Sequence, residues 1–204
     1  MPTILLYLRK FKTNKMRKLL LIVALAIGFI SNAQDREFKF DKLGLTDYII
    51  TDIPNKTKSE IYQKVINWIK TTYKNPESVI ASEIKDEYVK INGVTSGLTT
   101  FSVLGTTFVS ENKYTFEISV KDGKYKFDVL EIQDYTEPSK YSSGGWGNYH
   151  ITEDINNELY KKNGDVRGRY KIAEKAIPEY FNQLNKSLLD YINSNEVTNS
   201  KKDW

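Results

Sequence analysis

Apolar and polar side chains alternate strictly through most of residues 113–132. The dipeptide Asp122-Gly123 interrupts this alternation, and such a pair favours a two-residue hairpin turn because glycine accepts a positive φ without steric cost. A turn there pairs Val120 with Tyr125, Ile118 with Phe127, and Phe116 with Val129, all apolar and all on one face. The pattern therefore predicts two antiparallel strands in a single register.

The same register sorts the polar residues. Ser119 then faces Lys126, and Glu117 faces Asp128, on the opposite face of the hairpin. The alternation slips at Leu130, which indicates a bulge or the end of the second strand.

Two segments carry apolar residues at helical spacing. The first begins with Thr57-Lys-Ser-Glu60, a capping-box pattern, and extends to Tyr73. Trp68 lies on its apolar stripe, so we expect this side chain in the core. The second segment is residues 171–192, and its Pro178 either begins the main helix or kinks a longer one.

The rest of the chain is patterned less clearly. Further strands are predicted at residues 46–53, 79–84, 88–94 and 98–109, the last with a break at Gly105. Residues 35–45 are expected to be a lead-in, 137–150 an irregular loop and 151–161 weakly helical. We therefore predict an α+β domain with a curved antiparallel sheet of about five or six strands. The expected order is β-α-β-β-β-β-β-α, with the helices covering one face of the sheet.

The N-terminal segment has the pattern of an export signal. Arg17 and Lys18 precede the apolar run 19–30, and the small residues Ser31-Asn32-Ala33 follow it. This run is shorter than the roughly 20 residues that a helix needs to cross a membrane. We expect residues 1–33 to be a signal peptide cleaved after Ala33 or one residue later, with an uncleaved membrane anchor as the alternative.

Two translation starts are open, Met1 and Met16. Met16 is favoured because Met-Arg-Lys then stands directly before the apolar run. A cleaved leader places the protein in the periplasm or outside the cell, without a stable membrane anchor.

The composition of the chain argues against several kinds of function. The first 34 residues hold six of the 30 basic residues and no acidic one, so the remainder has 24 basic and 26 acidic residues. A net charge of −2 argues against nucleic-acid binding, which requires an excess of Lys and Arg. The chain has no cysteine, which excludes disulfides, a lipidated cysteine and sulfur-ligated metal sites.

Three stretches resemble a known family: Tyr48-Ile49-Ile50 with Pro54, the helix at residues 61–69, and the hairpin at residues 114–126. They are similar to the secreted bacterial domain-of-unknown-function family 4468, which has a TATA-binding-protein-like (TBP-like) fold. The resemblance covers roughly residues 45–135. It implies that architecture and an exported protein, but it supplies no catalytic residues because the family has no established function.

The expected organisation has four parts. They are a signal peptide at residues 1–33, a TBP-like α+β core at 45–135, a Gly/aromatic loop with C-terminal helices packing on that core at 136–194, and a frayed tail at 195–204.

Aromatic side chains gather in the Gly-rich loop. Tyr141, Trp146, Tyr149 and His150 stand there among small residues. Such side chains can stack on a sugar, a peptide or a partner surface, so these four are the candidate ligand or partner surface. In the alternative, Trp146 folds back onto the edge of the core.

Signals for catalysis are weak. His150 is the only histidine, and neither a nucleophile elbow nor a metalloprotease motif accompanies it. Glu153 and Asp154 lie near it in sequence, but we interpret these acids, like Asp134 and Glu137, as solvated surface residues. No cofactor and no metal site are predicted.

The sequence therefore favours a non-enzymatic binding or interaction module of the cell envelope. Its partner would be an unknown protein or small ligand, and its oligomeric state stays open. The alternative is a hydrolase-type enzyme that uses His150 and nearby acids.

Export makes a direct prediction. Protein purified from its native host should begin at Gln34 or Asp35, because peptidase cleavage follows the small residues at positions 31–33. N-terminal sequencing measures this, and mature protein that retains residues 1–33 would show that the leader is an anchor.

Overall fold

The computed structural model describes residues 37–194 apart from residue 104 and residues 141–142. The expected signal peptide, residues 1–33, and the expected tail, residues 195–204, lie outside the described residues. Among the residues described, no helix is long and apolar enough to cross a membrane.

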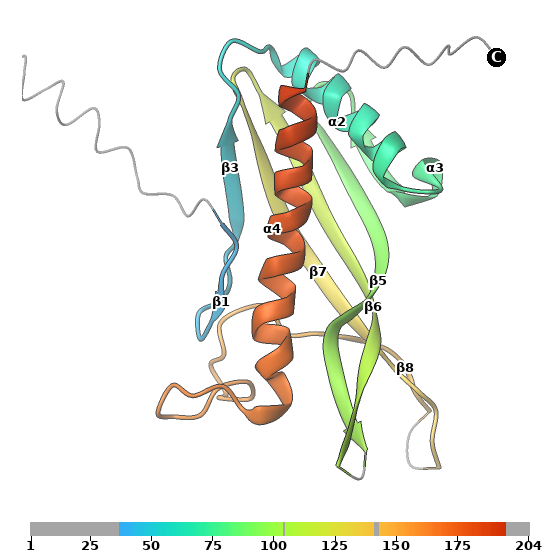
Figure 1. Cartoon of the computed structure of the whole chain (residues 1–204), viewed down its shortest axis with the longest axis vertical. Helices are drawn as coiled ribbons and strands as arrows, with labels where there is room; N and C mark the ends of the chain where they lie inside the picture. The colour runs from blue at the N-terminus through green and yellow to red at the C-terminus, as the bar shows by residue number, and fades with distance from the viewer. Residues whose placement is uncertain (1–36, 104, 141–142, 195–204) are drawn as a thin grey trace, which may run out of the picture. The chain divides into compact units, whose positions relative to one another are not determined.

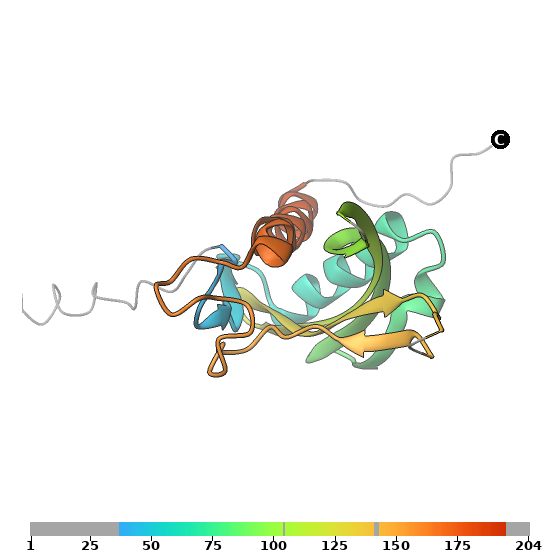
Figure 2. The same ribbon diagram turned by 90° about the horizontal axis from the view of Figure 1, so that it is seen from below.

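A six-stranded antiparallel sheet carries its two long helices on one face (Figure 1, Figure 2). The strands pair in the order β3-β7-β6-β5-β4, and β8 also pairs with β7. They are β3 (Tyr48–Asp52), β4 (Ile80–Ile84), β5 (Tyr88–Val103), β6 (Thr106–Lys121), β7 (Lys124–Thr136) and β8 (Gly145–Asn148). The helices are α2 (Lys58–Thr72), the short α3 (Pro76–Val79) and α4 (Lys171–Asn193), which follows the 3-10 turn η1 (Gly168–Tyr170). The predicted α+β class is confirmed.

The hairpin of β6 and β7 has the register that the alternation predicts. Val120 pairs with Tyr125, Ile118 with Phe127, and Phe116 with Val129, and all six are buried. The rings of Phe116 and Phe127 stack with their centroids 4.6 Å apart. Leu130 has no opposite residue, because the register shifts between Thr115 and Phe116. The predicted bulge is therefore confirmed.

The helices begin as their sequences indicate. Thr57 caps α2 by accepting from the backbone N–H of Glu60, and the Glu60 carboxylate accepts from the Thr57 N–H at 2.8 Å. Trp68 is only 1% exposed, and its Nε1 donates to Ser187 Oγ on α4 at 3.1 Å. The expected core position of Trp68 is confirmed. Pro178 lies inside α4 and does not begin it.

Strand β5 differs from the expectation. The predicted strand at 88–94 and the predicted break at Gly105 are confirmed, but the first strand does not end at residue 94: β5 runs on to Val103 before the chain turns back near Gly105 into β6. The register shifts between Ser96 and Thr100, so residues 97–99 stand opposite one residue of β6. The buried Asn112 stabilises this bulge: its Oδ1 accepts from two β5 backbone N–H groups at 3.1 and 3.3 Å.

Residues 37–45 are not merely a lead-in. They form a small hairpin of β1 (Phe40–Asp41) and β2 (Gly44–Leu45). Phe38, Phe40 and Leu45 are buried in the core. The backbone of Phe38 is bound twice to the Asn182 amide on α4, at 2.7 and 3.0 Å. Apolar residues at positions 38, 40 and 45 were a signal that the polar composition of the segment hid.

Residues 151–161 form no helix, contrary to the expectation. The cause is Asp154, whose carboxylate accepts from the backbone N–H groups of Glu158, Leu159 and Tyr160 at 2.7, 3.2 and 2.7 Å. Such a bond offers the backbone an alternative to helical pairing. Asp154 is 2% exposed, so its interpretation as a solvated surface acid is wrong.

The buried indole of Trp68 should contribute strongly to stability. We expect Trp68→Ala to lower the free energy of unfolding by about 3–5 kcal/mol, because it leaves a large cavity between α2 and α4. Chemical denaturation measures this. The matched variant Trp146→Ala, which removes an exposed indole, should cost about 1 kcal/mol or less. Equal losses in both variants would contradict the core position of Trp68.

Candidate functional site

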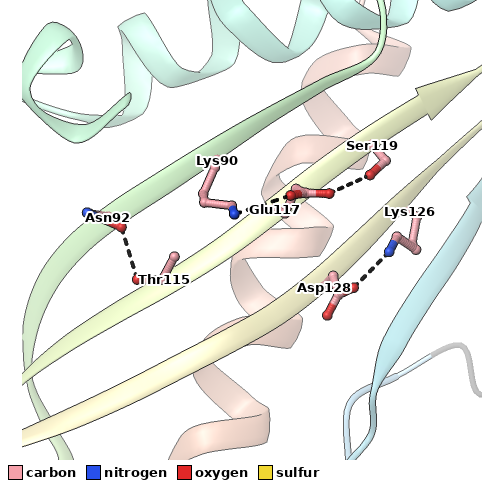
Figure 3. A network of polar contacts seen from close by, with 7 residues as sticks. All are labelled: Lys90, Asn92, Thr115, Glu117, Ser119, Lys126 and Asp128. Carbon is pink, nitrogen blue, oxygen red and sulfur yellow. Dashed lines mark hydrogen bonds and ion pairs between the residues drawn. The ribbon is translucent and has the colours of Figure 1, made fainter. Parts of the chain in front are cut away.

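The face of the sheet that points away from the long helices is covered by polar side chains (Figure 3). Thr115 Oγ1 donates to Asn92 Oδ1 at 2.9 Å. The other contacts on this face are Lys90 with Glu117, Ser119 with Glu117, and Lys126 with Asp128. Every second residue of β5, β6 and β7 points this way because side chains alternate along a strand. We call this surface the open face.

A pocket of about 530 Å³ lies at the open face, beside the start of β4. Strand β4 pairs with β5 only over residues 88–91, so the segment between α2 and β4 borders the exposed part of β5. The pocket is lined by Tyr73, Lys74, Asn75, Ser78, Val79, Asn92, Gly93, Val94, Lys113, Tyr114, Thr115, Glu131 and Gln133. Amide and hydroxyl groups dominate this lining, and its charged residues are two lysines and one glutamate.

A row of planar polar groups leads from the pocket onto β8. Gln133 Nε2 donates to Glu131 Oε1 at 2.9 Å and to Asn148 Oδ1 at 3.0 Å. Gln133 and Asn148 are opposite residues of β7 and β8. The row therefore presents a carboxylate and two amides side by side on the open face.

An aromatic pair lies next to this row. Trp146 pairs across the strands with Tyr135, and their ring centroids are 5.2 Å apart. Lys113, which lines the pocket, places its Nζ 4.1 Å from the centre of the Trp146 ring. Trp146 is 37% exposed. The Lys113 side chain thus connects the pocket with the aromatic pair.

Tyr73 and Tyr114, which line the pocket, form a cluster of three tyrosine hydroxyls with Tyr180. Tyr180 Oη donates to Tyr114 Oη at 2.9 Å, and Tyr73 Oη lies 3.4 Å from Tyr114 Oη. Burial raises the pKa of all three hydroxyls, so they stay neutral across the physiological range. Gly93 leaves room for this cluster, because a Cβ there would lie 2.2 Å from the Tyr114 ring.

The structure distributes the four candidate residues of the aromatic loop differently. Trp146 lies exposed on β8, so residues 137–150 are not wholly irregular. Tyr149 turns toward the core, where its ring meets Phe40 and Tyr170. His150 is exposed, and Tyr141 lies outside the described residues. The structure therefore does not bring Trp146, Tyr149 and His150 together as one cluster, and their shared role stays a prediction.

The residues that line the pocket were not predicted from the sequence. Lys113, Thr115, Glu131 and Gln133 occupy alternate positions of two strands, and that periodicity was visible. What the sequence did not show is that β4 begins only at Ile80, after α3, and that β8 adds Trp146 to the same face.

His150 contacts a backbone oxygen and a hydroxyl of its sequence neighbours. Its Nε2 lies 3.1 Å from the backbone oxygen of Glu153 and 3.4 Å from Thr152 Oγ1. In the described part of the chain, no group of three or more His, Asp or Glu side chains lies close enough to hold a metal ion. The hydrolase alternative therefore gains no support from this geometry.

Part of the chain is similar to a known protein family. Residues 49–134 match the family model described as a domain of unknown function (DUF4468) with TBP-like fold. This stretch of the chain is similar to a DUF4468 domain. The resemblance seen in the sequence and its TBP-like fold are confirmed. The DUF4468 match includes the pocket residues on β5, β6 and β7, whereas Trp146 lies beyond it.

Two solved structures share this DUF4468 fold. A DUF4468 family protein from Bacteroides ovatus is 10% identical with a TM-score of 0.55, over 76% of this chain and 89% of that one. A TBP-like protein from Parabacteroides distasonis is 15% identical with a TM-score of 0.50, over 73% and 92% of the two chains. At these identities the likeness extends to the fold alone. No curated protein matches the chain.

The buried Asp154 makes stability depend on pH. Burial favours its neutral form, but the three backbone N–H donors outweigh that effect and lower the pKa of Asp154. A carboxylate whose folded pKa is depressed stabilises the fold above its unfolded pKa of about 3.9, and this contribution is lost as the pH falls through the folded value.

We therefore expect Asp154→Asn to be less stable than the wild type at pH 6, with a difference that shrinks below about pH 4. Denaturation across this pH range measures the effect, and Glu153→Gln is the control because Glu153 is exposed. A difference that stayed constant with pH would contradict the assigned role of the Asp154 carboxylate.

Proposed function

We propose that this DUF4468 protein is an exported, non-enzymatic binding module of the cell envelope that takes up its ligand or partner at the open-face pocket. The observation that carries the proposal is the Lys113 side chain, which lines a polar pocket of about 530 Å³ while lying over the exposed Trp146 ring. Ligand sites combine a concave surface with a few converging polar groups, and aromatic rings supply contact area.

Two further observations support binding over catalysis. His150 Nε2 contacts a backbone carbonyl and a threonine hydroxyl, and the nearby Asp154 carboxylate is bound by three backbone N–H groups. The acids near the pocket are engaged by neighbouring side chains, as Glu131 is by Gln133 at 2.9 Å. A catalytic pair of carboxylates needs a cleft in which both face the reacting bond. Export rests on the signal-peptide pattern of residues 1–33.

The proposal predicts where binding occurs. We expect a soluble extract of the host's cell envelope, added to the ¹⁵N-labelled exported protein, to move the NMR signals of Asn92, Thr115 and Gln133. In Gln133→Leu, which removes the amide at the centre of the row, these changes should shrink or vanish. Tyr48→Ala is the control, since Tyr48 is a 40% exposed aromatic residue on the open face that does not line the pocket.

Signals that move only in other parts of the protein would contradict the pocket as the binding site. A hydrolytic activity that is present in the wild type and lost in His150→Ala would contradict the non-enzymatic role.

A further inference from the structure

We infer that the ligand of this pocket is a saccharide that stacks on Trp146 and binds the row of planar groups formed by Glu131, Gln133 and Asn148. This inference rests on the proposed function, because it names the class of ligand that the same pocket takes.

The aromatic pair offers a surface suited to a sugar ring. The face of an indole carries negative charge from its π electrons, and it attracts groups that carry positive charge. The Lys113 ammonium group already lies 4.1 Å from the centre of the Trp146 ring, so this face is accessible to a group that approaches from the pocket. The C–H bonds on one side of a pyranose ring carry partial positive charge as well. A sugar can therefore take the place of the ammonium group, which moves toward the oxygen atoms of the ligand.

The planar groups match the hydroxyl groups of a sugar. Each sugar hydroxyl both donates and accepts, and a side-chain amide offers two donors and an acceptor in one plane. Gln133 and Asn148 place two such amides beside the Glu131 carboxylate, linked at 2.9 and 3.0 Å. Trp146 and Asn148 point to the same face of β8 because they are two residues apart. Stacking and hydrogen bonding are thus available to one ligand at once.

Other ligand classes fit this surface less well. A peptide strand would add to the edge of β5 beyond Ile91, where β4 no longer pairs, but the row lies two and three strands away from that edge, on β7 and β8. A polyanion requires an excess of positive charge, whereas the charged lining is only Lys74, Lys113 and Glu131. A wholly apolar ligand would displace water from the carboxylate and the amides of the row and offer them no hydrogen bonds in return.

The test uses the exported protein and defined saccharides. Isothermal titration is carried out with neutral cello-, malto-, xylo- and manno-oligosaccharides and with acidic oligogalacturonate and chondroitin sulfate. We expect at least one of them to bind, and the neutral and acidic sets show which kind of sugar is preferred. Trp146→Ala should then weaken binding about tenfold or more, whereas Trp146→Phe should keep most of it because a ring face remains.

Two further variants test the geometry. Asn148→Ala should also weaken binding at least severalfold, since it removes one amide of the row. Tyr48→Ala should bind as the wild type does; its ring also lies near a lysine, Lys126, at 5.4 Å, but outside the pocket. Circular dichroism confirms that each variant is folded before titration.

The results separate this inference from the proposed function. If none of the saccharides binds while the envelope extract still moves the signals of the pocket residues, the saccharide is wrong and the binding module stands. If a saccharide binds equally well to wild type and Trp146→Ala, the site named here is wrong. If neither the extract nor any saccharide affects the pocket, both proposals fail.

Discussion

The turn at Asp122-Gly123 is the constraint on which the other elements depend. It sets the register of β6 against β7, and it also fixes three other segments in place. The Asp122 carboxylate accepts from the backbone N–H of Lys58, the first residue of α2, at 2.8 Å. Gly123 accepts from Ile53 at the end of β3 and donates to Lys56 just before the helix, at 2.7 and 2.8 Å. One tight turn thus aligns two strands and positions the start of the helix that covers them. The Asp122 bond also satisfies one of the backbone donors that a helix start leaves free.

The covered face and the open face follow from the same register. Because side chains alternate along a strand, fixing Phe116, Ile118 and Phe127 toward the helices fixes Glu117, Ser119 and Lys126 away from them. Both long helices pack on the apolar side, so among the residues that the structure describes no long helix covers the polar side. Strand β8 then extends that uncovered surface and adds an indole to it. The proposed binding surface and the core thus both follow from the same alternation of apolar and polar residues.

Local patterns predicted the parts of the fold whose causes are local. The hairpin register and the Thr57 cap each depend on residues that are near one another in sequence, so both were predictable. The course of β5 depends on Asn112, which lies 13 and 14 residues away from the backbone groups it binds. A sequence pattern does not show that such a side chain is buried. Asp154 misled in the same way, since an acid beside other polar residues has the composition of a surface.

The candidate site was predictable only in part. Trp146 stood out because a tryptophan among glycines is conspicuous, yet its neighbours Lys113 and Tyr135 come from two other strands. Their proximity follows from the pairing of β7 with β6 and with β8, which brings residues 113, 133 and 148 into one line. Tyr149, three residues after Trp146, packs on the core instead. Only the strand pairing separates these two roles.

The bulge that Asn112 stabilises divides the β5–β6 hairpin into two stretches with different structural roles. On one side of the bulge, Tyr88–Ser96 pair with Glu111–Ser119 as part of the sheet and are held by the core. On the other side, Thr100–Val103 pair with Thr106–Val109. The stacked rings of Phe101 and Phe108 are exposed there. Adding or removing matched pairs of residues in this projection would therefore leave every register nearer the core intact. Evolution can in this way reshape the far end of the molecule while the folded body stays the same.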